Sequence, residues 1–275
     1  MKVVTWNVNS LRARMPRVLE FLDQHSPDAL LLQETKCSPE QFPADELLDA
    51  GYEAVHHSGG RWAGVAVLAP KGHGLEEVQS GLPGEARADQ ARWIEARVGS
   101  IGLTVASVYV VNGREVGSEP FAEKLQFLEA LASRVGALKD ERLVVGGDFN
   151  VAPADLDVWD PAAWEGSTHV TADERDRLAA VEEAGALVDC FRTLHPDGQG
   201  FTWWDYRGGS FHRGMGLRID LLLASEPLAG AIKACGIDRD FRTPLSPRPV
   251  ARRPAAGRSA GPSPGGSCRR GRPTT

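Results

Sequence analysis

The stretch Leu143-Val144-Val145-Gly146-Gly147-Asp148-Phe149-Asn150-Val151-Ala152-Pro153 joins a short apolar strand to a polar turn. Residues 143–145 have the length and character of a buried strand, which ends at the two glycines and Asp148. An acid and an amide, Asp148 and Asn150, therefore stand just past the strand, where connecting loops gather. Polar residues follow apolar strands at several other places in the chain, and this repeated pattern is the basis for the fold and site predicted below.

Polar side chains also stand at the ends of other expected strands. These are Asn7 after a strand over 2–7, Glu34 after Ala29–Gln33, Tyr109 after a strand over 104–109, and Asp220 within an apolar strand over 217–223. Such carboxylates and carboxamides could converge on one cleft, where their oxygens suit Mg²⁺ or Mn²⁺ rather than Zn²⁺. A single residue of this kind is more often a solvated or capping group. The prediction of a metal site therefore depends on all of these residues occurring together, in the expected strands or at their ends.

The remaining pattern predicts an α+β fold, with sheets packed face to face and helices outside. Further strands are expected at 53–57, 64–69, 93–98 and 201–204, and the alternation in 93–98 is typical of a half-buried antiparallel strand. One helix is expected before Pro27 and another from Pro120, with Phe121 and Leu128 on its apolar face. A third, over 172–184, is charged and expected to be exposed.

With these motifs the sequence resembles the exonuclease III branch of the endonuclease/exonuclease/phosphatase family. The matching stretches are 6–13 (WNVNSLRA), 32–36 (LQETK), 147–153 (GDFNVAP), 201–207 (FTWWDYR) and 216–224 (GLRIDLLLA). They follow one another in the family's order from Met1 to about Asp240. The resemblance implies a four-layered α/β sandwich of two mainly antiparallel sheets with outer helices, which hydrolyses phosphodiester bonds in DNA with a divalent metal.

The resemblance also implies a metal site. It makes Glu34 the main ligand of Mg²⁺ or Mn²⁺, with Asn7 beside it, and we count Asp148 and Asn150 among the candidate ligands. Asp148 would orient or activate the attacking water, and Asn150 would hold a phosphate oxygen. The competing interpretation of Asn7 and Asn150 is that they are turn residues.

Two further catalytic candidates follow from the resemblance. Tyr109 corresponds to a tyrosine near the scissile phosphate, although it could instead be a core tyrosine with a satisfied hydroxyl. Asp220 corresponds to an aspartate that positions the reacting groups, and as a carboxylate in an apolar strand it should have a partner. Val111 stands where the family has a proline, so the loop through Asn112 could sit differently.

Substrate contacts are expected from Asn112, Trp203 and Arg207. The aromatic and basic mixture in Trp203-Trp204-Asp205-Tyr206-Arg207 could stack a base or sugar and hold a phosphate. The competing interpretation is core packing, which should take at least one of the two tryptophans.

Composition and charge indicate the cellular compartment and the partners of the protein. The 275 residues carry a net charge of −6, yet 241–275 hold eight Arg and no Lys, Asp or Glu, which leaves −14 for 1–240. DNA contact would therefore use a local basic patch, with metal ions offsetting the carboxylates. Four widely spaced cysteines and the lack of an 18-residue apolar run predict a cytoplasmic protein away from membranes. We expect a monomer that acts on duplex DNA with 3′ ends or abasic sites.

The C-terminal segment departs from the family. A Ser-Asp-His-x-Pro motif is expected soon after Asp240, but no His follows His212. The segment 241–275 instead holds seven Pro, five Gly and eight Arg, so we predict a disordered basic tail after a nuclease domain over 1–240. A frameshift near codon 241 is one hypothesis, and a genuine basic tail is the other. Either would remove the last strand and a catalytic His, and so impair activity.

The sequence therefore predicts a DNA-repair phosphodiesterase, a 3′-to-5′ exonuclease that also cuts at abasic sites. Two alternatives stay open. The chain could be a non-catalytic DNA-binding or pseudogene product, or another phosphodiesterase of the family, acting on an inositol phosphate or on sphingomyelin.

Overall fold

The computed structural model describes residues 1–205, 209–239 and 241. These residues lie in one compact unit, Met1–Thr243. The predicted tail beyond Phe241 and the last strand that we expected to be missing lie outside the described residues. Among the helices within those ranges, none combines the length and apolar character needed to cross a bilayer.

Two sheets form the centre of this unit. The smaller has the order β1 (Val3–Asn7), β2 (Ala29–Gln33), β4 (Val65–Pro70), β3 (Tyr52–His57). The larger has the order β5 (Leu75–Ser80), β6 (Trp93–Val98), β7 (Leu103–Tyr109), β8 (Leu143–Asp148), β12 (Asp220–Ser225), β9 (Leu187–Asp189). Among the described strands, β1–β2 and β7–β8 are the pairs that run in parallel, and a separate ribbon joins β10 (Trp203–Trp204) to β11 (Gly216–Leu217).

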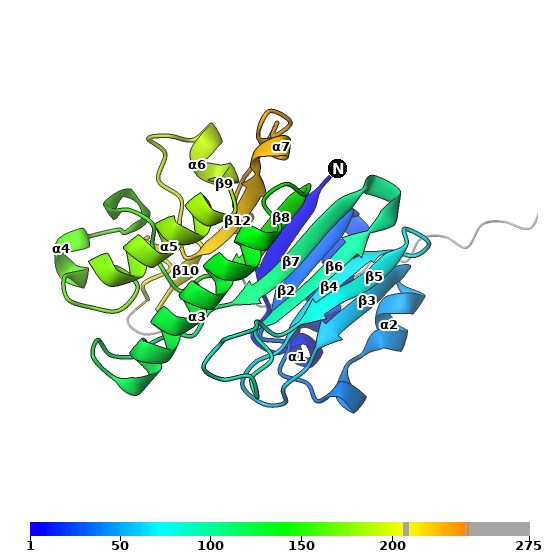
Figure 1. Ribbon diagram of the computed structural model, residues 1–275. Coiled ribbons are helices and arrows are strands. Elements are labelled where there is room, and N and C mark those ends of the chain that lie inside the picture. The colour runs from blue at the N-terminus through cyan, green and yellow to red at the C-terminus, as the bar shows by residue number, and fades with distance from the viewer. Residues whose placement is uncertain (206–208, 240, 242–275) are drawn as a thin grey trace, which may run out of the picture. The chain divides into compact units, whose positions relative to one another are not determined.

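Helices pack around the two sheets. They are α1 (Leu11–His25), α2 (Ala44–Asp49), α3 (Glu119–Ala137), α4 (Pro161–Trp164), α5 (Ala172–Ala184), α6 (Cys190–Leu194) and α7 (Glu226–Ala229), with short 3₁₀ turns at Pro39–Gln41, Gly99–Ile101 and Asp155–Asp157. In Figure 1, α3 and α5 run side by side across the larger sheet, and α1 and α2 lie beyond the smaller one.

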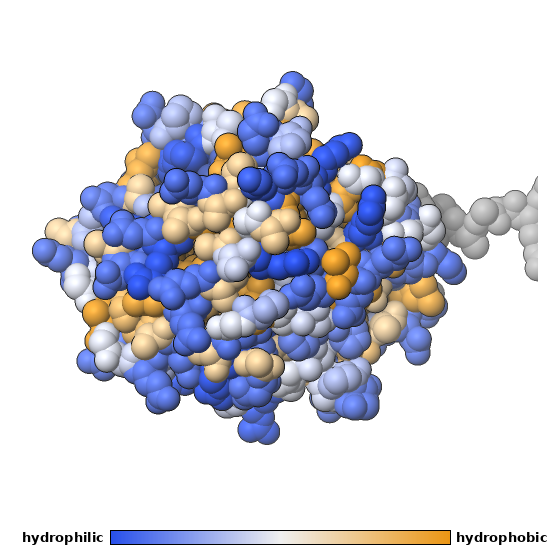
Figure 2. Space-filling view, viewed as in Figure 1, coloured by the Kyte–Doolittle hydropathy of each residue, from blue (hydrophilic) through white to orange (hydrophobic). Residues whose placement is uncertain are grey.

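Apolar cores separate these layers. One core lies between α3, α5 and the larger sheet, a second between the two sheets, and a third between the smaller sheet and α1. The predicted α+β sandwich of four layers is thus confirmed. Hydrophilic residues dominate the face drawn in Figure 2, where apolar residues gather only in small groups.

The glycines before Asp148 let neighbouring elements approach closely. A Cβ on Gly147 would lie 1.9 Å from the carbonyl oxygen of Val108 in β7. One on Gly146 would lie 2.7 Å from a methyl carbon of Leu31 in the opposite sheet. Strand β8 therefore needs glycine at both positions, so that Asp148 is brought between the two sheets.

Three local predictions were wrong. Strand β6 is not half-buried, because Glu95 is covered by α3 and pairs with Arg134. Helix α5 is not simply exposed, because Leu178 and Val181 pack in the core beneath it. The strand expected over 217–223 is divided into β11 and β12, because the intervening Arg218 turns into the interior to pair with acidic side chains.

The folded part extends at least one residue past the expected boundary at 240. The ring of Phe241 lies 5.0 Å from that of Phe21 and 6.1 Å from that of Trp6, edge-on to both. The guanidinium of Arg17 lies 4.5 Å from the same ring. Phe241 therefore packs against α1 instead of beginning the tail.

Candidate active site

Strand register brings the predicted polar residues together at one end of the sandwich. In the larger sheet, Asp148 is opposite Tyr109 in the parallel β7–β8 pair and opposite Asp220 in the antiparallel β8–β12 pair. In the smaller sheet, Asn7 ends β1 beside the end of β2, directly before Glu34. The convergence expected from the sequence is present.

Asn7 links the two sheets across this end. Its amide Nδ2 donates to Glu34 Oε1 at 2.8 Å and to Asp148 Oδ2 at 3.0 Å. The second carboxylate oxygen of Glu34 lies 2.7 Å from the ammonium of Lys36. Glu34 has a φ of 53°, a left-handed conformation that costs free energy in a non-glycine residue and is found preferentially at functional sites.

The Asp148 carboxylate is buried, with 5% of the residue exposed. Burial raises the pKa of Asp148, and the negative charges of Asp220 and Glu34 raise it further, whereas the backbone N–H of Asn150 and the amide of Asn7 lower it. Three carboxylates therefore share one small region. That excess of negative charge favours a cation there.

Tyr109 lies against the same carboxylates. Burial, with Glu34 and Asp148 nearby, raises the pKa of its hydroxyl well above the ordinary value, so the hydroxyl remains protonated and can donate. Arg92 opposes this shift: its guanidinium lies 4.7 Å from the centre of the Tyr109 ring and donates to the Tyr109 carbonyl at 3.2 Å. Tyr109 thus belongs to the site and is not a remote core residue.

Asn150 and Asn112 form a carboxamide pair beside Asp148. Asn150 is buried with a φ of 50°, and its Nδ2 donates to the Val110 carbonyl at 2.9 Å. Its Oδ1 accepts from Asn112 Nδ2 at 3.1 Å. The side-chain oxygen of Asn150 is therefore engaged, and its second amide proton suits a phosphate oxygen better than its oxygen suits a metal.

A groove of about 580 Å³ adjoins this pair. It is lined by Asn112, Trp164, His169 and Trp203, among others. The rings of Trp164 and Trp203 meet edge-on at 6.2 Å. Trp204 is buried, as expected for one of the two tryptophans. The remaining predicted substrate residue, Arg207, lies outside the described residues.

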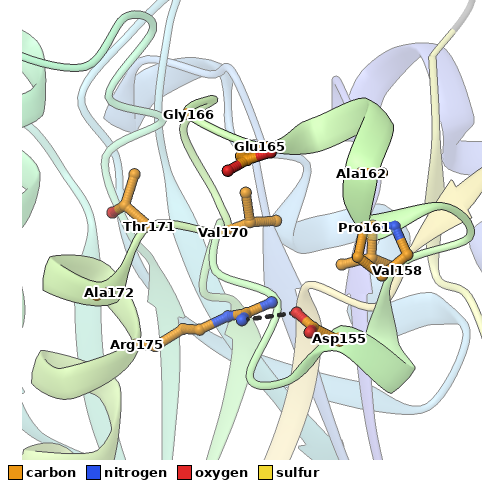
Figure 3. A pocket seen from close by; sticks show the side chains of 10 residues that line it. All are labelled: Asp155, Val158, Pro161, Ala162, Glu165, Gly166, Val170, Thr171, Ala172 and Arg175. Carbon is orange, nitrogen blue, oxygen red and sulfur yellow. Dashed lines mark hydrogen bonds and ion pairs between the residues drawn. The ribbon is translucent and has the colours of Figure 1, made fainter.

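A second hollow, of about 550 Å³, holds none of the predicted residues. Figure 3 shows the side chain of Arg175 reaching Asp155 at its edge. The two form an ion pair at 2.9 Å, and Arg175 Nε donates to the Ala152 carbonyl. Since its guanidinium is already engaged, we place the candidate site at the groove beside Asn112.

The donor set fits a hard divalent cation. Within the described ranges, no group of three or more His, Cys, Asp or Glu side chains is arranged to hold a metal. Mg²⁺, however, commonly uses only one or two carboxylates and completes its shell with water and substrate phosphate. Glu34 and Asp148 offer carboxylate oxygens of this kind, and Asn7 offers an amide oxygen that also accepts from the backbone N–H of Asn9 at 3.1 Å.

Four residues around the site were missed from the sequence: Arg92, Lys124, His169 and Glu174. Lys124 and Glu174 are both fully buried and form an ion pair behind Asn150. His169 is buried as well, and its Nδ1 bonds to the Asn150 carbonyl. Helical spacing could have revealed Lys124, which lies three residues after Phe121 and four before Leu128 on the apolar face of α3.

Comparison with known proteins agrees with this geometry. The model of the endonuclease/exonuclease/phosphatase family matches residues 4–246. An exodeoxyribonuclease of Bacillus subtilis (strain 168) is 33% identical over 247 residues, which cover 87% of this chain and 94% of that protein.

Solved structures give the same result. A 3′–5′ exonuclease from Neisseria meningitidis aligns with a TM-score of 0.84 and 38% identity over 90% of this chain and 95% of its own. A second structure, described as a Neisseria 3′ phosphatase bound to a product DNA hairpin, aligns equally well. An AP endonuclease from Archaeoglobus fulgidus has a TM-score of 0.77 and 34% identity, covering 84% of this chain and 89% of its own.

The resemblance drawn from the sequence motifs is confirmed by the family match, the relatives and the fold. The chain belongs to the endonuclease/exonuclease/phosphatase family.

Proposed function

We propose that this protein is a metal-dependent DNA-repair phosphodiesterase that removes nucleotides from 3′ ends of duplex DNA and cuts at abasic sites. The single observation that carries the proposal is the link from Asn7 to Glu34 and Asp148, which brings together two carboxylates from different sheets. The relatives named above for exonuclease and AP-endonuclease activity support it.

Each side chain has a separate role in hydrolysis. The Asp148 carboxylate orients the attacking water and accepts its proton, while Asp220, next to it in the sheet, helps to position the reacting groups. Asn150 holds a phosphate oxygen with its second amide proton. Tyr109, kept protonated, donates toward the charge that develops at the scissile phosphate.

Glu34, Asn7 and Asp148 would hold Mg²⁺ or Mn²⁺. A bound cation of this kind polarises a phosphoryl oxygen and stabilises the departing oxygen. Glu34 is the principal ligand in this proposal, because it is the carboxylate that Asn7 and Lys36 hold in place.

Trp203 and Asn112 border the substrate groove, where an aromatic face can stack on a base or sugar and an amide can reach a phosphate. Arg207 is proposed to add a phosphate contact. We further propose that the protein acts as a monomer in the cytoplasm, and that its rate is reduced because no His follows His212.

Removal of a 3′-terminal phosphate is a second candidate activity. It is favoured by the likeness to the Neisseria protein described as a 3′ phosphatase, at a TM-score of 0.84 against 0.77 for the AP endonuclease. Both activities use the same chemistry, attack of water on a phosphorus atom at a 3′ position.

One experiment measures each proposed activity on DNA and compares it with activity on an inositol phosphate. The chain is incubated with Mg²⁺ and four labelled substrates: a duplex with a recessed 3′ hydroxyl, the same duplex with a 3′ phosphate, a duplex with an internal abasic site, and an inositol phosphate. The proposal expects cleavage of the DNA substrates only. Preferential cleavage of the inositol phosphate would assign the chain to another branch of the family.

A further inference from the structure

Lys124 is a buried cation directly behind the carboxamide pair. It projects from α3 and has no exposed surface. Its Nζ donates to the Asn150 carbonyl at 2.6 Å, to Thr168 Oγ1 at 3.3 Å and to the Asn112 carbonyl at 3.4 Å. It also pairs with the Glu174 carboxylate. One ammonium therefore contacts the backbone of both asparagines.

Glu174 is as fully engaged as Lys124. Its Oε1 accepts from the His169 backbone N–H at 2.9 Å and from Thr168 Oγ1 at 2.8 Å. Its Oε2 accepts from the backbone N–H and the hydroxyl of Thr171, at 3.0 and 2.7 Å. The carboxylate therefore fixes the loop 168–171 as well as the cation.

Burying an ion pair in this way is expensive, and well-packed apolar side chains of similar volume often serve stability as well or better. Burial lowers the pKa of Lys124, and Glu174 opposes that shift. The pair stands at a position in α3 where the periodicity calls for an apolar residue. The presence of the ion pair there suits a requirement other than stability.

That requirement is visible at Asn150. This residue is held in a left-handed conformation, and its carbonyl receives hydrogen bonds from both Lys124 and His169. The carbonyl of Asn112 is reached by the same ammonium, and the two side-chain amides bond to each other. The position of both amides thus depends on where Lys124 holds the backbone.

We propose that Lys124, balanced by Glu174, is a positioning residue that fixes the Asn150 carboxamide beside Asp148 and the Asn112 carboxamide at the edge of the groove. The inference rests on the proposed function in one respect, that these amides face the substrate phosphate. Lys124 itself touches no reacting atom. Its effect is to hold the amide donors in the orientation that aligns the bound phosphate for attack, so that its loss lowers the rate more than the affinity.

The test uses the double variant Lys124→Met, Glu174→Gln in the full chain. Removing both charges avoids leaving one of them buried alone, and the glutamine oxygen can still accept from loop 168–171. The matched control is Arg134→Met, Glu95→Gln, which removes another ion pair of α3, one that joins the helix to β6 and includes no residue that lines the groove.

Single-turnover rates on a recessed 3′ duplex and on a 3′-phosphate duplex are measured for both variants, with thermal unfolding of each. We expect the Lys124 variant to lose about 10- to 100-fold in rate with little change in DNA affinity. The control should keep its rate at a similar loss of Tm. Equal rates in the two variants at matched stability would overturn the proposal.

A second measurement does not depend on activity. Side-chain amide signals of Asn112 and Asn150 are assigned by NMR from Asn→Ser variants. Shifted or broadened signals in the Lys124 variant, with unchanged signals in the control, support positioning. Unchanged signals in both overturn it. If the wild-type chain processes neither DNA end, the proposed function fails, while the amide signals still decide the role of Lys124.

Discussion

Asn7 ends a strand of the smaller sheet and Asp148 ends a strand of the larger one, and the amide of Asn7 donates to the Asp148 carboxylate at 3.0 Å. The contact joins residues 141 positions apart in sequence. Since the same amide also donates to Glu34, the two carboxylates are held by the packing of the two sheets and not by a single flexible loop.

Loss of the Glu34 carboxylate should abolish metal binding. We expect Glu34→Gln to keep the hydrogen bond from Asn7 but to offer a far weaker metal ligand. Calorimetric titration with Mn²⁺ should show no saturable binding in the variant. Glu40→Gln, which changes an exposed carboxylate nearby, should bind as the wild type does. Unchanged affinity in Glu34→Gln would rule out this ligand assignment.

Loss of the Asp148 carboxylate should reduce the chemical step with little effect on DNA binding. Asparagine preserves the shape of the side chain but cannot accept the proton of the attacking water, so kcat should fall by about 10² to 10⁴. Rates are measured by release of labelled 3′ nucleotides, and affinity by fluorescence anisotropy. Asp140→Asn, at the opposite end of β8, is the control, and an equal loss there would argue against a specific role for Asp148.

The sequence predicted the sandwich and the convergence at its end because both follow from local patterns. Apolar runs of strand length gave β1, β2, β6, β7 and β8, and polar residues at their ends gave the site. The buried ion pairs could not be predicted from local patterns, because their partners are far apart in the sequence. The alternation in β6 predicted that Glu95 faces solvent, but Arg134, 39 residues away, pairs with it and covers it. Lys124 can be buried only because Glu174, 50 residues away, balances its charge.

The Glu182 side chain predicts a pH dependence of stability. Burial, together with the charge of Asp189, raises its pKa to about 7 from 4.5, although Arg218 opposes the shift. The folded state therefore binds a proton that the unfolded state releases between those values. Stability should fall as pH rises from about 5 to 7.

Glu182→Gln removes that titration. With discounting for partial exposure, the variant should exceed the wild type by about 1–2 kcal/mol at pH 8 and by little at pH 5. Urea unfolding at both values measures the difference. Glu183→Gln, the exposed neighbour on α5, should show no such pH-dependent gain. A gain for Glu182→Gln of equal size at both pH values would contradict the linkage.

The sequence after Phe241 should limit both stability and rate. We expect that replacing 242–275 with a strand bearing Ser-Asp-His-Ala-Pro will raise Tm and nuclease rate together, because the new segment would supply the strand and the His of the family motif. The same replacement with Ala for His should raise Tm alone. If the chain as given already matches the repaired version, the His is dispensable here.

Glu34 and Asp148 are proposed to act together in metal-dependent hydrolysis at DNA 3′ ends. The most direct test is a single-turnover assay, with protein in excess over a recessed 3′ duplex, comparing wild type, Glu34→Gln and Asp148→Asn in Mg²⁺ and in EDTA. We predict release of 3′ nucleotides by the wild type in Mg²⁺, none in EDTA, and a loss of at least about 10²-fold in each variant. Equal rates in wild type and variants, or a rate unaffected by EDTA, would contradict the account.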